Sequence, residues 1–255
     1  RVQTRQAYVY ATAARLGWAG PWLQAAEHGL DFFLRHYGRD DGLFATLASA
    51  DGAIIDDTPM LYDQAFALLA MAAVHRANPG RRDVVDRARA HRDSLSLMRA
   101  EGRGFRENGS WPYQANAQMH LLEAALAWFE ATGDEAWGVL ADEIVALALD
   151  AFIDPAGLFL REVFDAAWRP AEGDDGRFIE PGHQFEWAWL LQTWSRLRPG
   201  RDVGPVIEGL MRTGARGVDP RRDVAVDELW TDLSVRSHRA RLWPQTERLR
   251  ACLAR

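Results

Sequence analysis

Residues 181–191 read PGHQFEWAWLL, and this stretch has the features of a buried helix that begins at its proline. Proline is favoured in the first turn of a helix, and bulky apolar residues fill most of the later positions. The pattern predicts a helix over about 182–197. His183 and Glu186 are three residues apart, so they share one face of that helix. A histidine in such an apolar helix is suited to proton transfer near neutral pH.

The same helical periodicity continues along nearly the whole chain. Short breaks such as Asn78-Pro79-Gly80 and Thr132-Gly133-Asp134 separate the two helices of a pair, and longer glycine-containing segments separate successive pairs. Those longer segments contain Phe44, Phe105 and Phe159, which indicates a helical-hairpin repeat of roughly 55–60 residues. Helices are expected at roughly 2–15, 20–37, 58–77, 80–99, 114–132, 135–152, 182–197, 203–216 and 239–253.

Repeated helical hairpins predict an all-α protein, an (α/α)6-type barrel whose long loops form the rim of a pocket. Two of these rim loops are expected to contain small β-hairpins, Phe44–Leu47 with Ala53–Ile55 and Leu158–Phe164 with Trp168–Pro170. An α-solenoid of the binding type is the alternative. Its concave face would be charged or polar, whereas His, Trp and Tyr fall on the expected inner helices here. The barrel is therefore the favoured interpretation.

Composition narrows the range of functions. The 255-residue chain is long enough for a substantial core, and its net charge of −6 argues against a nucleic-acid partner. All 30 basic residues are arginines, which excludes Schiff-base catalysis by lysine. Cys252 is the only cysteine, so an intrachain disulfide and a multi-cysteine metal site are excluded. No apolar run could span a membrane, and the expected location is cytoplasmic.

A second histidine–glutamate pair repeats the first. His120 and Glu123 lie in QMHLLE (118–123), with Asn116 one turn earlier. Each pair could instead be a core histidine that bonds a neighbouring glutamate. Two histidines and two glutamates could also bind iron or zinc, but di-iron bundles use Glu-x-x-His and zinc proteases His-Glu-x-x-His, so no metal is expected. The dipole at the helix start is expected to lower the pKa of His183.

Three other segments carry candidate site residues, each with a structural alternative. Arg5 lies on a mostly apolar helix and is either a surface side chain or an inward cation for an oxyanion. Tyr62, followed by Asp63 and Gln64, could bind hydroxyl groups or cap and pack a helix. Trp243 and Glu247 lie near a proline-marked helix start and could equally form a surface cap. The remaining histidines, His28, His36, His75, His91 and His238, have charged neighbours and are expected to be exposed.

Five stretches together resemble the N-acylglucosamine 2-epimerase family, which includes mannose isomerases and cellobiose 2-epimerases. They are RVQTRQAYVYA (1–11), LYDQAFALLA (61–70), QMHLLEA (118–124), GHQFEWAWLL (182–191) and LWPQTE (242–247), and they follow the family's order. GHQFEWAWLL and LWPQTE are the most specific of them. RVQTRQAYV and YDQAF look closest to the bacterial isomerases that act on mannose.

The resemblance implies an (α/α)6 barrel that needs neither metal nor cofactor. His183 would match a catalytic histidine and Glu186 its partner carboxylate, with His120 and Arg5 also in the catalytic group. Substrate-binding positions would be Tyr62, Asn116, Glu123, Trp187, Trp243 and Glu247.

The chain departs from the family in two ways. It reads Asn116-Ala117-Gln118-Met119-His120 where relatives often carry Asn-Pro-x-Met-His. The resemblance also implies that the family's first helix and its C-terminal helices, with a second catalytic histidine, are not covered by these 255 residues. The expected organisation is one (α/α) barrel domain over residues 1–255, incomplete in this chain.

The function implied is metal-independent proton transfer on a sugar through a cis-enediol. Isomerisation of mannose to fructose is favoured, and 2-epimerisation of N-acylglucosamine or of a glucose-type sugar is the alternative. A glycoside hydrolase using Glu186 with Glu123 or Asp63, and a non-catalytic helical scaffold, are further alternatives. The expected partner is a small sugar, with no nucleic acid and no membrane. The sequence leaves open whether the protein forms a homodimer.

Overall fold

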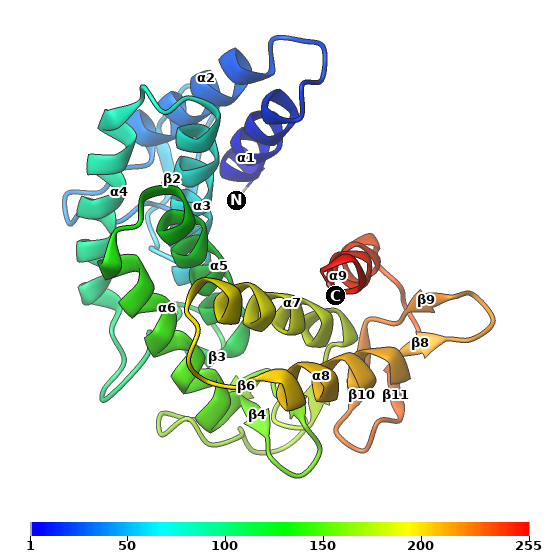
Figure 1. The fold of residues 1–255 in the computed structure, drawn as a ribbon. Coiled ribbons are helices and arrows are strands. Elements are labelled where there is room, and N and C mark those ends of the chain that lie inside the picture. Colours follow the sequence, from blue (N-terminus) through cyan, green and yellow to red (C-terminus); the bar gives the residue numbers. More distant parts are fainter. Residues whose placement is uncertain (1, 255) are drawn as a thin grey trace. The chain divides into compact units, whose positions relative to one another are not determined.

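The computed structural model describes residues 2–254, and these form two compact units (Figure 1). Among the described residues, unit 1 comprises 2–112 and His120–Leu140, and unit 2 comprises Tyr113–Met119 and 141–254. The α-helices of the described residues are α1 (Val2–Arg15), α2 (Trp22–His36), α3 (Leu61–Ala77), α4 (Arg82–Ser94), α5 (Ala115–Thr132), α6 (Glu135–Leu147), α7 (Pro181–Leu197), α8 (Gly204–Arg216) and α9 (Leu242–Leu253). The single-domain organisation remains a prediction.

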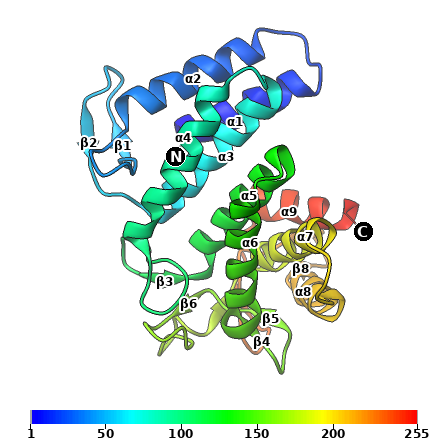
Figure 2. The same ribbon diagram turned by 60° about the vertical axis from the view of Figure 1, so that its left-hand side comes forward.

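In unit 1, α1 packs against both α2 and α3, and α3 also packs against α2 and α4 (Figure 2). Most of α3 is buried, including the whole run from Asp63 to Val74. α4 buries only Val84, Ala88 and His91, spaced so that they form one face. A helix buried on all sides has neighbours all round it, whereas a single apolar face is typical of a surface helix. The helices therefore alternate between central and peripheral positions.

Unit 2 repeats this arrangement with α7 in the central position. α7 packs against α8 and α9, and its residues from Pro181 to Ala188 are all buried. α8 and the residue that follows it approach α7 closely because they carry glycine at the contact. A Cβ atom at Gly214 would lie 2.8 Å from the Phe185 ring, and one at Gly217 would lie 2.3 Å from Pro181. Both glycines are therefore required by close packing.

Short strands occupy the long loops. Within the described residues they are β1 (Leu47–Ala48), β2 (Ile54–Asp56), β3 (Tyr113–Gln114), β4 (Ile153–Asp154), β5 (Phe159–Leu160), β6 (Val163–Phe164), β7 (Phe178–Ile179), β8 (Val218–Asp219), β9 (Val224–Ala225), β10 (Glu228–Trp230) and β11 (Val235–Ser237). The pairs β1–β2, β3–β6, β4–β5 and β8–β9 are antiparallel, and the largest sheet has the order β11-β10-β7. A 3-10 turn (Leu95–Met98) follows α4, and a π-helical turn (Ala148–Phe152) follows α6.

The phenylalanine repeat corresponds to a repeated loop structure. Phe44 pairs with Gly38, Phe105 with Arg99, and Phe159 with Asp154, in each case antiparallel and shortly after a helix has ended. Val218–Asp219 and Val224–Ala225 form a fourth pairing of the same kind. The chain therefore turns back on itself in the same way after α2, α4, α6 and α8.

A glutamine at the fourth position of the next helix fastens this loop. Gln64 Nε2 donates to the Phe44 carbonyl at 2.9 Å, and its Oε1 accepts from the Phe44 N–H at 2.8 Å. Two more pairs repeat this two-way bond: Gln184 with Leu160, and Gln245 with Ala225. Gln118 is the fourth residue of α5. The loop and the first turns of the helix are therefore held in a fixed register.

The predicted helices are confirmed, with adjustments at their ends. α3 begins at Leu61 rather than near 58, and α4 gives way to the 3-10 turn after Ser94. The first predicted hairpin is present as β1–β2. The second was predicted wrongly, because β5 pairs with β4 and β6 with β3. Only an isolated bridge, Phe164 to Pro170, matches that prediction.

Candidate functional site

His183 lies at the start of α7, where two carboxylates hold one of its ring nitrogens. Its Nδ1 lies 2.8 Å from Glu162 Oε2 and 3.0 Å from Glu180 Oε2. Both acceptors are carboxylates, so Nδ1 carries a proton and donates it to them. His183 is only 5% exposed and Glu162 only 4% exposed. The imidazole is therefore fixed in orientation within a water-poor environment.

An arginine completes this group of charges. Arg241 Nη2 donates to Glu180 Oε1 at 2.9 Å, and Arg241 Nε donates to Asp227 Oδ2 at 2.9 Å. The backbone N–H of Arg241 donates to the other oxygen of Asp227 at 2.9 Å. Asp227 therefore holds Arg241 at both ends, and Arg241 in turn holds the Glu180 carboxylate.

The charges determine the protonation state of His183. Burial by itself lowers the pKa of His183, but the negative charges of Glu162 and Glu180 and their hydrogen bonds raise that pKa well above its usual value. Burial tends to raise the pKa of Glu180, yet His183 and Arg241 together lower it. His183 is therefore an imidazolium at neutral pH. The expected lowering by the helix dipole is wrong, because two adjacent carboxylates outweigh a partial charge.

An indole, that of Trp243, lies beside this histidine. Its ring centroid lies 5.0 Å from that of His183, with the two planes tilted by 41°. A Cβ atom at Gly182 would lie 2.4 Å from the Trp243 ring, so only glycine leaves room for the indole. His183, Glu162, Glu180, Arg241, Asp227 and Trp243 form the group that we call the His183 cluster.

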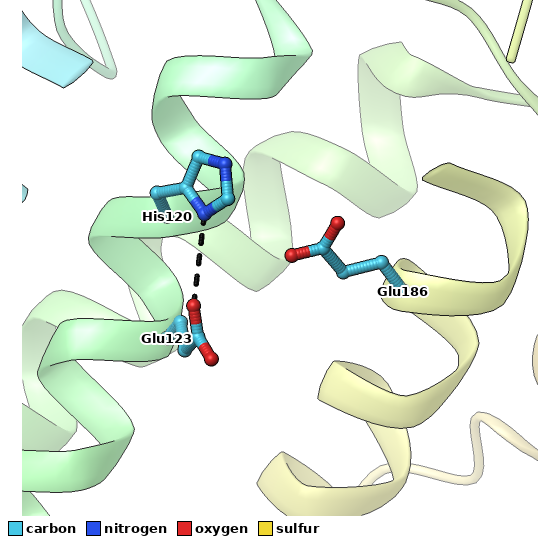
Figure 3. A group of neighbouring side chains, drawn as sticks. All are labelled: His120, Glu123 and Glu186. Carbon is cyan, nitrogen blue, oxygen red and sulfur yellow. Dashed lines mark ion pairs between the residues drawn. The ribbon is translucent and has the colours of Figure 1, made fainter. Parts of the chain in front are cut away.

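The role predicted for Glu186 stays a prediction, and other carboxylates hold the Nδ1 atom of His183. Glu186 was predicted as the carboxylate partner of His183, but Glu162 and Glu180 occupy Nδ1. Glu180 precedes His183 by three residues, so it has the same spacing as Glu186 on the N-terminal side of the histidine. Glu186 is itself buried, and α7 carries it one turn after Gly182 (Figure 3).

The second histidine lies among aromatic rings in unit 1. The ring centroid of His120 is 4.8 Å from that of Tyr62, edge to face, and 4.6 Å from that of Phe66. Its Nδ1 lies 3.6 Å from Glu123 Oε2 on the next turn of α5 (Figure 3). That distance is longer than a hydrogen bond. The two side chains form an ion pair only when His120 is protonated.

Arg5 joins the same group from α1. Its Nη2 donates a hydrogen bond to the Tyr62 hydroxyl, and its guanidinium carbon lies 4.2 Å from the centre of the Phe66 ring. Although Arg5 is exposed, its charged end therefore lies over α3, as an inward-directed cation would. Arg5, Tyr62, Phe66, His120 and Glu123 form the His120 cluster.

The other predicted site residues have different surroundings. Trp187 is fully buried and packs edge to face against Phe152, with centroids 6.0 Å apart, and its role as a substrate contact stays a prediction. Asn116 is partly exposed, and its Oδ1 is buried with no hydrogen-bond partner within the described residues. Glu247 is partly buried and lies 3.6 Å from Arg250.

The fastening glutamines explain why the candidates recur at fixed positions. Residues two places before and two places after such a glutamine are one helical turn apart and share a face. The candidates at these positions are Tyr62, Asn116 and Trp243 before the glutamine, and His120, Glu186 and Glu247 after it. Phe66 has the same position on α3 and was missed in the sequence. The spacing to Gln64 would have identified it.

Glu162, Glu180 and His183 present donor atoms within 4.8 Å of one another, a separation that could suit a metal ion. Each carboxylate oxygen already accepts a hydrogen bond, however. Glu162 Oε1 accepts from the Glu180 N–H at 3.0 Å, and the other three oxygens are bound by His183 and Arg241. These bonds favour a protonated imidazole over a metal ion at this position.

The comparison with known proteins agrees with these motifs. The profile of the N-acylglucosamine 2-epimerase family matches residues 1–255. This chain belongs to that family. A mannose-6-phosphate isomerase of Rhizobium meliloti (strain 1021) is 45% identical over 260 residues, which is 99% of this chain and 67% of the relative.

Solved structures confirm the fold of this family member. A D-mannose isomerase superposes with a TM-score of 0.86 at 22% identity, covering 99% of this chain and 68% of that protein. The cellobiose 2-epimerase of Spirochaeta thermophila DSM 6192 superposes with a TM-score of 0.83 at 24% identity, covering 96% and 65%. The chain thus spans about two thirds of the length of the relatives that it matches.

Across residues 2–254, none of the helices combines the length and the apolar character that crossing a membrane requires.

Proposed function

We propose that this protein is a sugar isomerase that moves a proton between C1 and C2 of an open-chain aldose through a cis-enediol. The observation that carries the proposal is the charged, buried imidazole of His183, held through Nδ1 at 2.8 Å and 3.0 Å by two carboxylates. Membership of the family and the 45% identity to a mannose-6-phosphate isomerase support the reaction class.

The chemistry requires an acid and a base close to the sugar. Loss of the C2 proton places negative charge on the carbonyl oxygen at C1, and an imidazolium can supply a proton to that oxygen. His183 is charged at neutral pH and is therefore proposed as the proton donor in this step, and as the acceptor in the reverse step. His120 and Arg5 are proposed as the second proton carrier and the cation for the oxyanion.

Mannose and mannose 6-phosphate are the substrates we propose first, with fructose or its phosphate as product. Relatives named for both sugars match this chain, D-mannose isomerase of Thermobifida fusca at 35% identity among them. The second candidate is 2-epimerisation, favoured by the fold shared with a cellobiose 2-epimerase. The two reactions share the enediol and differ in the carbon that regains the proton.

An NMR experiment in D2O tests the proposal and separates the two reactions. Mannose, mannose 6-phosphate, glucose and N-acetylmannosamine are each incubated with the protein, and the position of deuterium is determined. Isomerisation is expected to place deuterium at C1 of the ketose, whereas epimerisation places it at C2 of the epimer. A panel in which every sugar keeps all its carbon-bound protons would contradict the proposal.

A further inference from the structure

We propose that Glu162 and Glu180 are positioning residues for His183, and that Arg241 and Asp227 fix the Glu180 carboxylate, so that proton exchange with a sugar goes only through Nε2. The proposal deepens the proposed function and rests on it for the role of His183. Its structural part, the state of Nδ1, does not depend on the substrate.

The first argument is the geometry around Nδ1. One ring nitrogen faces two carboxylates, at 2.8 Å and 3.0 Å, so its proton is shared between two acceptors. Glu162 and Glu180 come from different parts of unit 2: Glu162 lies between β5 and β6, and Glu180 immediately precedes α7. Rotation of the ring would break both contacts at once.

The second argument is that neither carboxylate can turn away. Glu162 Oε1 accepts the backbone N–H of Glu180 at 3.0 Å, and Glu180 Oε1 accepts Arg241 Nη2 at 2.9 Å. Arg241 itself is held by both oxygens of Asp227, which is 4% exposed. The position of the imidazole is therefore set by a chain of bonds that ends in backbone groups.

The third argument concerns charge. Three carboxylates, Glu162, Glu180 and Asp227, face two cations, Arg241 and the His183 imidazolium. Arg241 bonds to Glu180 and Asp227. Burial raises the pKa of Glu162, and the charge of His183 opposes this rise. Glu162 and His183 thus stabilise each other's charged forms, whereas Arg241 neutralises Glu180.

The network also links the histidine to the indole beside it. Arg241 immediately precedes α9, and its guanidinium carbon lies 5.4 Å from the centre of the Trp243 ring. Trp243 in turn lies 5.0 Å from His183. The same arginine therefore contacts both the Glu180 carboxylate that bonds His183 and the indole that lies beside His183.

An NMR titration of His183 tests the structural part in the absence of a sugar. The ring signals are assigned by comparison with His183→Gln and followed from pH 5 to pH 10 in the wild type, Glu162→Gln and Glu180→Gln. Glutamine keeps the shape and removes the charge, so the midpoint is expected to fall by about one to three pH units in both variants. Glu208→Gln is the matched control, because its exposed carboxylate pairs with Arg212 on α8. Its midpoint is expected to equal that of the wild type.

The wild-type spectrum alone can overturn the proposal, even if a variant fails to fold. The nitrogen shifts of His183 at pH 7 are expected to show a proton on both ring nitrogens. A neutral ring with an unprotonated Nδ1, or an unchanged midpoint in both folded variants, would refute it.

Turnover supplies the functional readout. In Glu162→Gln and Glu180→Gln we expect kcat to fall at least about tenfold with KM nearly unchanged, and the pH profile to move in the same direction as the NMR midpoint. A parallel rise in KM with an unmoved pH profile would indicate a merely structural role. If the wild type converts no sugar while the titration behaves as expected, the proposed function fails and the positioning network stands.

Discussion

The His183 cluster and the His120 cluster share the His-x-x-Glu motif, but the two imidazoles differ in their neighbours and in their charge. His183 has two carboxylates on Nδ1 and carries a positive charge. His120 packs against the rings of Tyr62 and Phe66, and its Nδ1 lies 3.6 Å from Glu123 Oε2. A His-x-x-Glu spacing therefore fixes a shared helix face but not the state of the imidazole. The neighbours supplied by other segments decide that state.

The largest expected effect is that of removing the charged histidine. His183→Ala should lower kcat/KM by about 10²–10⁴-fold, the usual contribution of a positioned acid or base. Deuterium exchange into the sugar measures the loss, and circular dichroism checks that the fold is retained. If a folded His183→Ala protein exchanges deuterium at the wild-type rate, the charged imidazole of His183 is not the proton carrier that distinguishes its cluster.

The aromatic surroundings of His120 call for a different variant. His120→Phe preserves ring packing against Tyr62 and Phe66, so the melting temperature should change little while turnover falls by about 10²-fold. His183→Phe should instead destabilise the protein, because it leaves the buried Glu162 carboxylate without its cation and Glu180 with Arg241 alone. Comparable melting temperatures for the two phenylalanine variants would remove the contrast between the clusters.

A smaller effect is expected from crowding Trp243. The methyl group of Gly182→Ala would meet the indole at 2.4 Å and force it away from His183. We expect a stability loss of about 1–3 kcal/mol and a rise in KM for the sugar. Gly204→Ala serves as the control, since its methyl would meet only the Asp202 carboxylate, at 3.1 Å. Equal effects at both positions would show that Trp243 has no special relation to His183.

A third buried histidine, His91, extends the comparison to the pH dependence of stability. Its substitution should leave turnover almost unchanged. His91, expected to be exposed, is 1% exposed, and its Nδ1 lies 3.1 Å from the Gly42 carbonyl. Burial lowers its pKa to about 4. In the unfolded chain His91 binds a proton below about pH 6.5, whereas in the folded protein it does so only near pH 4. The free energy of unfolding therefore decreases as the pH falls from about 6.5 toward 4.

Between pH 7 and pH 5 this amounts to about 2 kcal/mol. Urea unfolding of the wild type and His91→Gln at both pH values measures it, and the variant should lack this component. His183 has the opposite sign: its raised pKa stabilises the folded state below pH 6.5, and this contribution disappears as the pH rises through the folded pKa. An identical pH dependence in the wild type and His91→Gln would show that His91 is not held neutral.

Much of the fold was predictable because its signals are local. Helical periodicity and breakers such as Thr132-Gly133-Asp134 located the helices to within a few residues, since the pattern of burial repeats with the helical turn. The phenylalanine repeat marked the loops correctly. The partner of β5 was not predictable, because two-residue strands carry too little pattern to specify pairing.

The site was predictable only in part. The motif identified His183, but Glu162 lies 21 positions earlier in a loop, and its role depends on how β5 and β6 return to the start of α7. His91 has charged neighbours in sequence and an apolar environment in space. Trp187 follows Glu186 directly, yet the helix turns it into the core against Phe152.

The sequence by itself determined the helices, their order, the family and the positions from which site residues extend, because each depends on spacing along a single segment. Tertiary structure alone decided which carboxylates meet His183 and therefore that it is charged, while His91 is neutral. The physical reason is that a buried imidazole takes its pKa from desolvation and from charges within a few ångströms, and both are set by segments distant in the chain.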